Sequence, residues 1–222
     1  MRTTKNAIIL FVLLFPKLIL AQQTEAFHKI KVYGKIEVRI QNSPQHNVEL
    51  KADSIVSRNV SYKVNNGELH IKADSPIPRQ TNVTVVVSCS NVDTIEIGGG
   101  AKCYSKGTIE TKYLYLEAGA ATELDLLVDV DSVSSRISKN GFIRLTGKAE
   151  SATIKTTTGG SYAADAMECK RFYATMNGGV ARAKVEQKIE ANLSQKSTLL
   201  YLGTPKIIEA PSSKGEITPD QE

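Results

Sequence analysis

A repeat of about nineteen to twenty residues constrains the fold of this chain more than any other feature of its sequence. From about residue 92 onward, a short run of β-forming residues stops at a turn of small residues and begins again, in about seven copies. Glycines mark the turns at 98–100, 118–120, 158–160 and 177–179. A repeat of this length is the signature of a solenoid, in which each copy forms one coil and buries its apolar side against the neighbouring copies.

Apolar columns appear when the copies are aligned on their turns. Three positions before the turn centre stand Ile97, Leu116, Ile137, Thr156, Met176 and Leu193. Five positions before it stand Ile95, Leu114, Ser135, Ile154, Ala174 and Ala191, and a column after the turn contains Leu124, Leu145, Ala164 and Tyr201. The residues between the first two columns are mostly polar. Because alternate residues of a strand point to opposite faces, this pattern predicts parallel strands stacked with the same face inward.

Each copy is therefore expected to contain a short strand, a tight reversal, a second short strand and a looser return. The turn glycines should supply positive φ angles and room for closely approaching backbone. These glycines are Gly99, Gly100, Gly119, Gly159, Gly160, Gly178 and Gly179. A phosphate-binding loop is rejected for them, because no helix follows and no Lys-Ser/Thr pair completes the motif.

Residues 22–91 have longer alternating stretches separated by turn residues. In "FHKIKVYGKIEVRIQ" the apolar residues alternate with polar ones, and Asn65-Asn66-Gly67 between two such runs predicts a β-hairpin. After residues 1–21, the sequence contains no long run of apolar residues at helical spacing. The predicted fold class is all-β, with an irregular N-terminal β section at 22–91 packed on parallel β-helix repeats at 92–222 to give one continuous domain.

Residues 1–21 have the order of a secretory signal peptide. Arg2 and Lys5 precede an apolar run at 7–20, and Ala21 supplies a small residue for cleavage. A proline and a lysine interrupt the run, which is shorter than the ~20 apolar residues of a membrane-spanning helix, so no integral span is expected after removal. The chain should then be exported to the periplasm, the outer-membrane surface or the extracellular space.

Removal of the signal peptide also removes most of the net positive charge. The whole chain has 28 Lys+Arg and 23 Asp+Glu, and three of the basic residues lie within 1–21, which leaves a net charge of +2. A nearly neutral chain without runs of like charge gives no sign of nucleic-acid binding.

The cysteines and histidines predict no metal, cofactor or catalytic centre. Cys89, Cys103 and Cys169 lie in strand-like sequence without metal-ligand spacing, and we expect them to be small buried side chains. An exported chain could instead pair Cys89 with Cys103. The three histidines are far apart in the N-terminal section and are expected at the surface: they are His28, His46 and His70.

Outward-facing side chains offer two kinds of site. Glu123 and Asp125 lie two apart on one strand face, a spacing that two cooperating carboxylates of a polysaccharide lyase or hydrolase could use. A binding or interface face is the alternative, because tyrosines among polar neighbours suit contacts with carbohydrate or protein. That face comprises Tyr113, Tyr115, Arg171, Tyr173 and Asn177. The same tyrosines could simply cover apolar surface or form a subunit interface.

Several short motifs, in this order, resemble the auto-transporter adhesin family with a head GIN domain, secreted bacterial proteins common in Bacteroidetes. They are the beginning "FHKIKVYGKIEVRI", the middle "NNGELHIKA", the repeated small-Gly-small turns and the closing "LLYLGTPKII". Tyr201, Gly203 and Pro205 fit a Tyr-x-Gly-x-Pro strand end. The turns at 138–141 and 194–197 depart from the glycine pattern. The resemblance implies a right-handed parallel β-helix and surface adhesion, and it carries no catalytic residues over.

The function expected from these features is non-catalytic binding of a host or bacterial surface glycan or protein. Two alternatives stay open. One is a structural envelope module that self-associates into a homo-oligomer. The other is a polysaccharide lyase or hydrolase that uses Glu123 and Asp125.

Overall fold

The computed structural model describes residues 24–52, 54–78, 81–194, 196–211 and 213–220. The predicted signal peptide lies outside these residues. The described chain forms a β-solenoid of about seven turns, with one four-residue helix, α1 (Ser54–Ser57). None of the described helical structure has the length and apolar character needed to cross a membrane.

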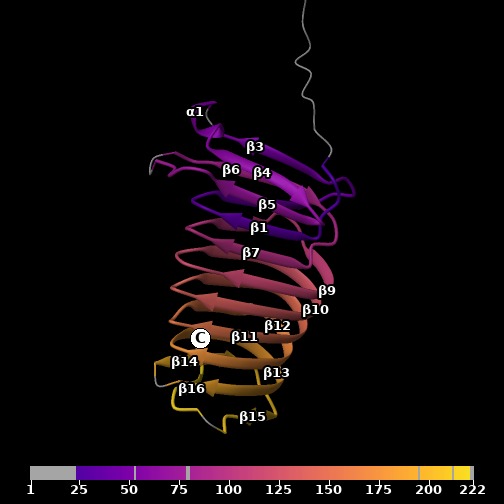
Figure 1. Cartoon of the computed structure of the whole chain (residues 1–222). Coiled ribbons are helices and arrows are strands. Elements are labelled where there is room, and N and C mark those ends of the chain that lie inside the picture. Colours follow the sequence, from indigo (N-terminus) through magenta and orange to yellow (C-terminus); the bar gives the residue numbers. More distant parts are fainter. Residues whose placement is uncertain (1–23, 53, 79–80, 195, 212, 221–222) are drawn as a thin grey trace, which may run out of the picture.

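Within the described residues, sixteen strands join in one hydrogen-bonded sheet that winds around the stack (Figure 1). They are β1 (Lys29–Tyr33), β2 (Glu37–Asn42), β3 (Asn47–Lys51), β4 (Val60–Asn65), β5 (Glu68–Ala73), β6 (Thr84–Cys89), β7 (Thr94–Gly98), β8 (Lys102–Ser105), β9 (Ile109–Ala118), β10 (Glu123–Ser138), β11 (Phe142–Thr157), β12 (Ser161–Asn177), β13 (Gly179–Leu193), β14 (Ser197–Leu202), β15 (Ile207–Glu209) and β16 (Glu216–Pro219). From β9 to β13, strands that are consecutive in the sequence are neighbours in the stack.

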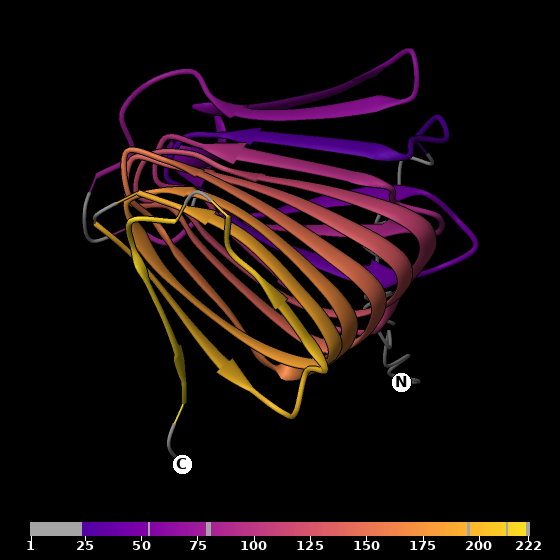
Figure 2. The ribbon, with the colours of Figure 1, turned by 90° about the horizontal axis from the view of Figure 1, so that it is seen from below.

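Each coil is flattened and has one tight edge and one rounded edge. Figure 2 looks along the stack and shows narrow loops at one edge and ribbons that curve without a break through the other. The turns form the tight edge. We call the stretch of each coil that runs toward the turn side 1, and the stretch that runs away from it side 2. In β10, side 2 is residues 123–127, the rounded edge is 128–131 and side 1 is 132–138.

In β10 to β13 the return at the rounded edge is a continuous bent strand, in place of the expected looser connection. β10 and β11 have 16 residues each, and β12 has 17. The register continues through the bend, where Val128 pairs with Gly147 and Val130 with Ala149. Between β10 and β11 the backbone pairing therefore runs through the bend without a loop. Between β12 and β13 the register shifts at the bend, between Ala164 and Glu168 and again between Cys169 and Arg171.

The register confirms stacked inward columns and corrects one coil of the sequence alignment. Ile97 pairs with Ala118, which pairs with Ile137, so Ala118 takes the place predicted for Leu116. Likewise, Leu126 pairs with Leu145 and replaces Leu124 in the column after the turn. This turn lies two residues later than predicted, because its only glycine, Gly119, is not at its centre.

Backbone angles show which turn positions need glycine. Positive φ angles occur at Gly99, Gly100, Gly159, Gly160, Gly178 and Gly179. At Gly179 the φ is +98°, and an added Cβ would also overlap the carbonyl oxygen of Gly160 in the neighbouring coil. Gly119 has no positive φ, which corrects the expectation for this residue. In its turn, Ala121 has the positive angle, at 54°.

The N-terminal section contains regular coils as well as antiparallel strands. β1 pairs in parallel with β5 and β7, and β2 pairs in parallel with β6 and β8. The coil of β1 and β2 therefore lies between the coil of β5 and β6 and the coil of β7 and β8, although it precedes both in the sequence (Figure 1). The alternating apolar residues of the first coil are all buried: Ile30, Val32, Ile36, Val38 and Ile40.

Antiparallel strands close the N-terminal end of the stack. β4 and β5 form the predicted hairpin, with Asn65 opposite Glu68 and positive φ at Asn66 and Gly67. β3 pairs antiparallel with β6. Both strands cover sheet edges that would otherwise present unpaired backbone groups.

One apolar core runs through the coils, and the strands that enclose it carry the outward side chains. Its largest rings, Tyr162 and Phe172, are buried with their centroids 6.0 Å apart. Both belong to β12, one on side 2 and one on side 1, so they join the two sides of a single coil. Removing such a ring costs about 3–5 kcal/mol. The outward side chains therefore stand on a rigid base.

Candidate functional site

Side 1 carries the predicted binding residues on one surface. Tyr113 and Tyr115 lie on β9, and Arg171, Tyr173 and Asn177 lie on β12. The strands β10 and β11 separate them. At the usual spacing of strands, Tyr115 and Tyr173 stand about 14 Å apart. We call these five residues, with the outward side-1 residues of β10 and β11 between them, the tyrosine face.

Small hydroxyl side chains form the floor of the tyrosine face. One row of the register runs Tyr115, Ser134, Thr153 and Tyr173, and the next runs Tyr113, Ser132, Ser151 and Arg171. No large side chain stands between the ends of either row. Because a hydroxyl group can both donate and accept hydrogen bonds, this floor can bind polar groups in either role.

The two tyrosines of β9 differ in exposure. Tyr113 is 73% exposed. Tyr115 is partly buried, and its hydroxyl donates a hydrogen bond to Glu117 Oε2 at 2.9 Å. Burial and this hydrogen bond raise the pKa of Tyr115. The Tyr115 ring is thus held in place with its proton, while the Tyr113 ring is open to contact a partner.

The tyrosine face also contains basic side chains. The row beside Tyr115 contains Glu117, Arg136 and Lys155. Among the described residues, neither of these two basic side chains nor Arg171 takes part in an ion pair. The tyrosine face therefore offers positive charge that no carboxylate of the described residues neutralises in an ion pair.

A neutralised charge cluster lies further toward the N-terminal end of side 1. Lys29 Nζ is 2.6 Å from Glu96 Oε1, and Lys31 Nζ is 3.1 Å from Glu68 Oε2. The hydrogen bond to Glu96 raises the pKa of Lys29, and the hydrogen bond from Lys31 lowers the pKa of Glu68. These ion pairs neutralise the charges on β5, β1 and β7 and connect the N-terminal coils.

The predicted carboxylate pair lies on side 2, away from the tyrosine face. Lys102 Nζ is 2.8 Å from Glu123 Oε2, and Arg144 Nη1 is 3.2 Å from Asp125 Oδ2. Each carboxylate is thus matched by a cation from a neighbouring strand. In a glycosidase, one carboxyl group acts as an acid and the other as a nucleophile or base across a bound sugar. Two solvated surface ion pairs do not resemble that arrangement.

The histidines make local contacts in the N-terminal section. The Phe27 backbone N–H donates to His46 Nδ1 at 3.2 Å, and the two rings pack edge to face with centroids 4.7 Å apart. Burial lowers the pKa of His46. His70 Nε2 lies 3.1 Å from Glu68 Oε2. Within the described chain, no group of three or more His, Cys, Asp or Glu side chains could hold a metal ion.

All three cysteines are free and buried. Burial raises the pKa of the Cys89 thiol to about 12 and that of Cys169 to about 11. The alternative Cys89–Cys103 disulfide is wrong, because β2 lies between the strands that carry these residues. Two strand spacings are about 9.5 Å, whereas bridged Cα atoms are less than about 7 Å apart.

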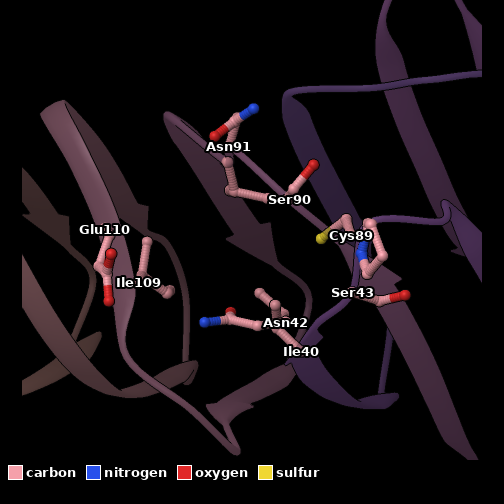
Figure 3. Close-up of a pocket in the computed structure, with 10 residues that line it drawn as sticks. Ile40, Asn42, Ser43, Cys89, Ser90, Asn91, Ile109 and Glu110 are labelled. Carbon is pink, nitrogen blue, oxygen red and sulfur yellow. The ribbon is translucent and has the colours of Figure 1, made fainter.

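A pocket of about 370 Å³ opens at the rounded edge near the N-terminal end (Figure 3). Buried apolar side chains of the solenoid core line its inner part: Ile40, Cys89, Val92 and Ile109. Polar side chains surround its mouth: Asn42, Ser43, Ser90, Asn91 and Glu110. We call this cavity the edge pocket.

The edge pocket was not predicted from the sequence. Its residues come from the ends of β2 and β6 and the start of β9, which meet only because the first coil lies between two later ones. At Asn42 the chain leaves the coil and runs into β3, so it does not wrap round the edge there. The one local signal is Asn91, a turn-forming residue whose φ is 56°.

Comparisons with known proteins agree with this architecture. A family model described as "putative auto-transporter adhesin, head GIN domain" matches residues 26–205. The structure of a putative adhesin from Bacteroides fragilis is similar with a TM-score of 0.80 at 15% identity, over 89% of this chain and 94% of that chain. A putative adhesin from Parabacteroides distasonis gives a TM-score of 0.71 at 15% identity, with the same coverage of 89% and 94%.

Another similar structure has a different description. A putative lipid binding protein from Parabacteroides distasonis has a TM-score of 0.63 at 12% identity, over 89% of this chain and 94% of that chain. At such identities these likenesses establish the shared fold. Curated protein sequences include no match to this chain. Because the family model covers most of the chain, this protein belongs to the auto-transporter adhesin family with a head GIN domain.

Proposed function

We propose that this protein is an exported, non-catalytic binding module that holds a surface glycan or protein on its tyrosine face. The family description as an adhesin supports a role in attachment and fits an exported protein, in the periplasm or at the cell surface. The observation that carries the proposal is the row Tyr115, Ser134, Thr153 and Tyr173.

The geometry of that row suits a polar, extended partner. Tyrosine rings offer flat apolar surface together with a hydroxyl group, a combination that is common where proteins contact sugars and other proteins. The low floor between the rings gives a partner about 14 Å of width to occupy. Arg136, Lys155 and Arg171 add hydrogen-bond donors on the same face. A partner lying across β9 to β12 would therefore contact aromatic, hydroxyl and cationic groups together.

A second candidate is the self-associating envelope module. It is favoured by β15, which among the described strands pairs only with β13, at the C-terminal end of the stack. Its isoleucines Ile207 and Ile208 are 48% and 44% exposed. Exposed apolar residues on an edge strand are a template for pairing with another chain. The lyase or hydrolase alternative has no comparable support, because Glu123 and Asp125 are held in ion pairs.

The proposal is tested by binding the purified protein to an array of host and bacterial glycans and matrix proteins. Ser134→Arg places a long side chain on the floor of the tyrosine face. Ser161→Arg makes the same change at an exposed serine of side 2 and is the matched control. We expect saturable binding that Ser134→Arg abolishes and Ser161→Arg preserves.

Light scattering on the same samples separates the two candidates. A monomer that binds an array member through the tyrosine face supports the binding module. Absence of binding together with a concentration-dependent oligomer would refute it and favour the self-associating module. Equal loss of binding in both serine variants would also contradict the assignment of the tyrosine face.

A further inference from the structure

We propose that the edge pocket binds one neutral sugar residue, as a second site outside the tyrosine face. Its volume of about 370 Å³ lies at the lower end of the range of small-ligand pockets, about 300–1,000 Å³. The pocket combines an apolar interior with a ring of hydrogen-bonding side chains, which is the usual composition of a small-molecule site. The assignment does not depend on the function of the tyrosine face.

The polar groups at the mouth are available to a ligand. Ser90, Asn91 and Glu110 have no side-chain hydrogen bond or ion pair with any other described residue. Figure 3 shows them above and beside the opening, on segments that approach it from different parts of the chain. Together they offer a hydroxyl, an amide and a carboxylate. A sugar hydroxyl both donates and accepts, so it can pair with each of these groups.

The charge of the lining selects against anions. In the part of the chain that the structure describes, no Lys, Arg or His lines the edge pocket, and the one ionisable group at its mouth is the Glu110 carboxylate. An acidic sugar would meet this negative charge with no cation to offset it. A neutral sugar satisfies the same carboxylate by donating hydroxyl hydrogen bonds to it. The apolar interior, with Ile40, Val92 and Ile109, can pack against the C–H groups of the ring.

The mouth is held in shape before any ligand binds. Asn42 Nδ2 donates to the Thr108 carbonyl at 2.7 Å, and the Ser43 backbone N–H donates to the Cys89 carbonyl at 3.0 Å. The Asp93 backbone N–H donates to the His28 carbonyl at 3.0 Å, which fixes the segment that carries Asn91. A preformed site loses less conformational entropy on binding.

The test uses amide chemical shifts of the isotope-labelled protein during titration with single sugars. The probes are galactose and glucose, each compared with its uronic acid, galacturonate and glucuronate, which differ by one carboxylate. Ligands with so few atoms bind weakly, with dissociation constants on the order of 1 mM. We expect at least one neutral sugar to give saturable shifts at residues 89–92 and 108–110, and its uronic acid to bind at least tenfold more weakly.

Two variants test the mouth residues, and a third serves as the control. Asn91→Gly keeps a backbone that tolerates positive φ and removes the amide, and Glu110→Gln removes the charge with little change of shape. Each of these two substitutions should weaken binding of the neutral sugar at least fivefold. Asp131→Asn alters an exposed carboxylate of the rounded edge outside the pocket and should leave the affinity for the neutral sugar unchanged.

Three results would overturn the proposal that the edge pocket binds a neutral sugar. Shifts confined to residues outside the edge pocket, uronic acids that bind as tightly as the neutral sugars, or no saturable shift with either pair up to 100 mM would overturn the proposal. None of these results bears on the tyrosine face, whose test uses different variants and the array. Thermal unfolding of each variant confirms that it is folded.

Discussion

Replacing Gly179 by alanine tests whether the tight edge is closed by contact between backbones of successive coils. Gly179 has a φ of +98°, and a Cβ there would overlap the carbonyl oxygen of Gly160. That oxygen accepts a hydrogen bond from the Val180 N–H at 3.1 Å. The matched control is Gly100→Ala, since Gly100 has a φ of +83° but nothing within 4 Å of an added Cβ.

The expected magnitudes follow from these contacts. Forcing an L-residue into positive φ costs about 1–2 kcal/mol, and the lower entropy of the unfolded alanine chain returns about 0.4–1 kcal/mol. Gly100→Ala should therefore destabilise by about 1 kcal/mol. At Gly179 the overlap adds about 1–3 kcal/mol of packing strain and weakens a hydrogen bond worth about 1 kcal/mol. Gly179→Ala should lower the free energy of unfolding by about 3–5 kcal/mol.

Urea unfolding followed by circular dichroism measures both variants. For a domain of this size, each kcal/mol lowers Tm by about 2–4 °C, so thermal unfolding should show a fall of about 10 °C for Gly179→Ala and of a few degrees for Gly100→Ala. Equal effects of the two substitutions would refute the reasoning, because positive φ alone would then account for both.

Three further predictions concern the interior. At pH 8 the three cysteines of the native protein should resist Ellman's reagent, and all three should react in denaturant. The reason is that burial shields the thiols and raises the pKa of Cys89 to about 12 and that of Cys169 to about 11. Rapid labelling of the native protein would contradict this prediction. Burial lowers the pKa of His46 in the folded protein below its ordinary value of 6.5. The stability that neutral His46 contributes is therefore present above pH 6.5 and is lost as the pH falls through the pKa of the folded state. His46→Gln should reduce this pH dependence of the free energy of unfolding, measured in urea. Phe172→Ala should cost about 3–5 kcal/mol in the same assay, and a loss below about 1 kcal/mol would show that Phe172 is not in the core.

Much of the solenoid can be predicted from the sequence because its pairing is repetitive. Once one coil aligns with the next, the same alternation places Ile137, Thr156 and Met176 in one inward column, as the register shows. The error at Gly119 has a local cause. Its turn contains a single glycine, and the positive φ falls on Ala121, a residue type that rarely adopts it.

The order of the N-terminal coils could not be predicted in this way. The first coil lies between two later ones, and this placement depends on pairings between β1 and β5 and between β2 and β6 that span tens of residues. Alternation in these strands shows which residues face inward, but it does not show which strand is the neighbour. The edge pocket forms because the first coil lies between two later ones, which explains why the sequence shows no sign of Glu110 and marks Asn91 only as a turn residue.

The tyrosine face was predicted as a set of residues without its floor. Tyr113, Tyr115 and Tyr173 are recognisable in the sequence as aromatic residues with polar neighbours. The serines and threonine between them have no distinctive spacing in the sequence, and only the parallel register aligns Ser134 and Thr153 with the tyrosines.

The most direct test of the central claim is the dissociation constant of a partner found on the array, measured for matched pairs of variants. Tyr173→Ala and Arg171→Ala alter the tyrosine face, whereas Tyr104→Ala and Arg144→Ala make the same changes on side 2. Removal of an anchoring tyrosine or arginine from an interface typically costs about 2 kcal/mol or more. We expect binding at least tenfold weaker for the first pair and within twofold of the parent protein for the second. Equal effects of the two pairs, or a loss confined to the side 2 variants, would contradict the claim.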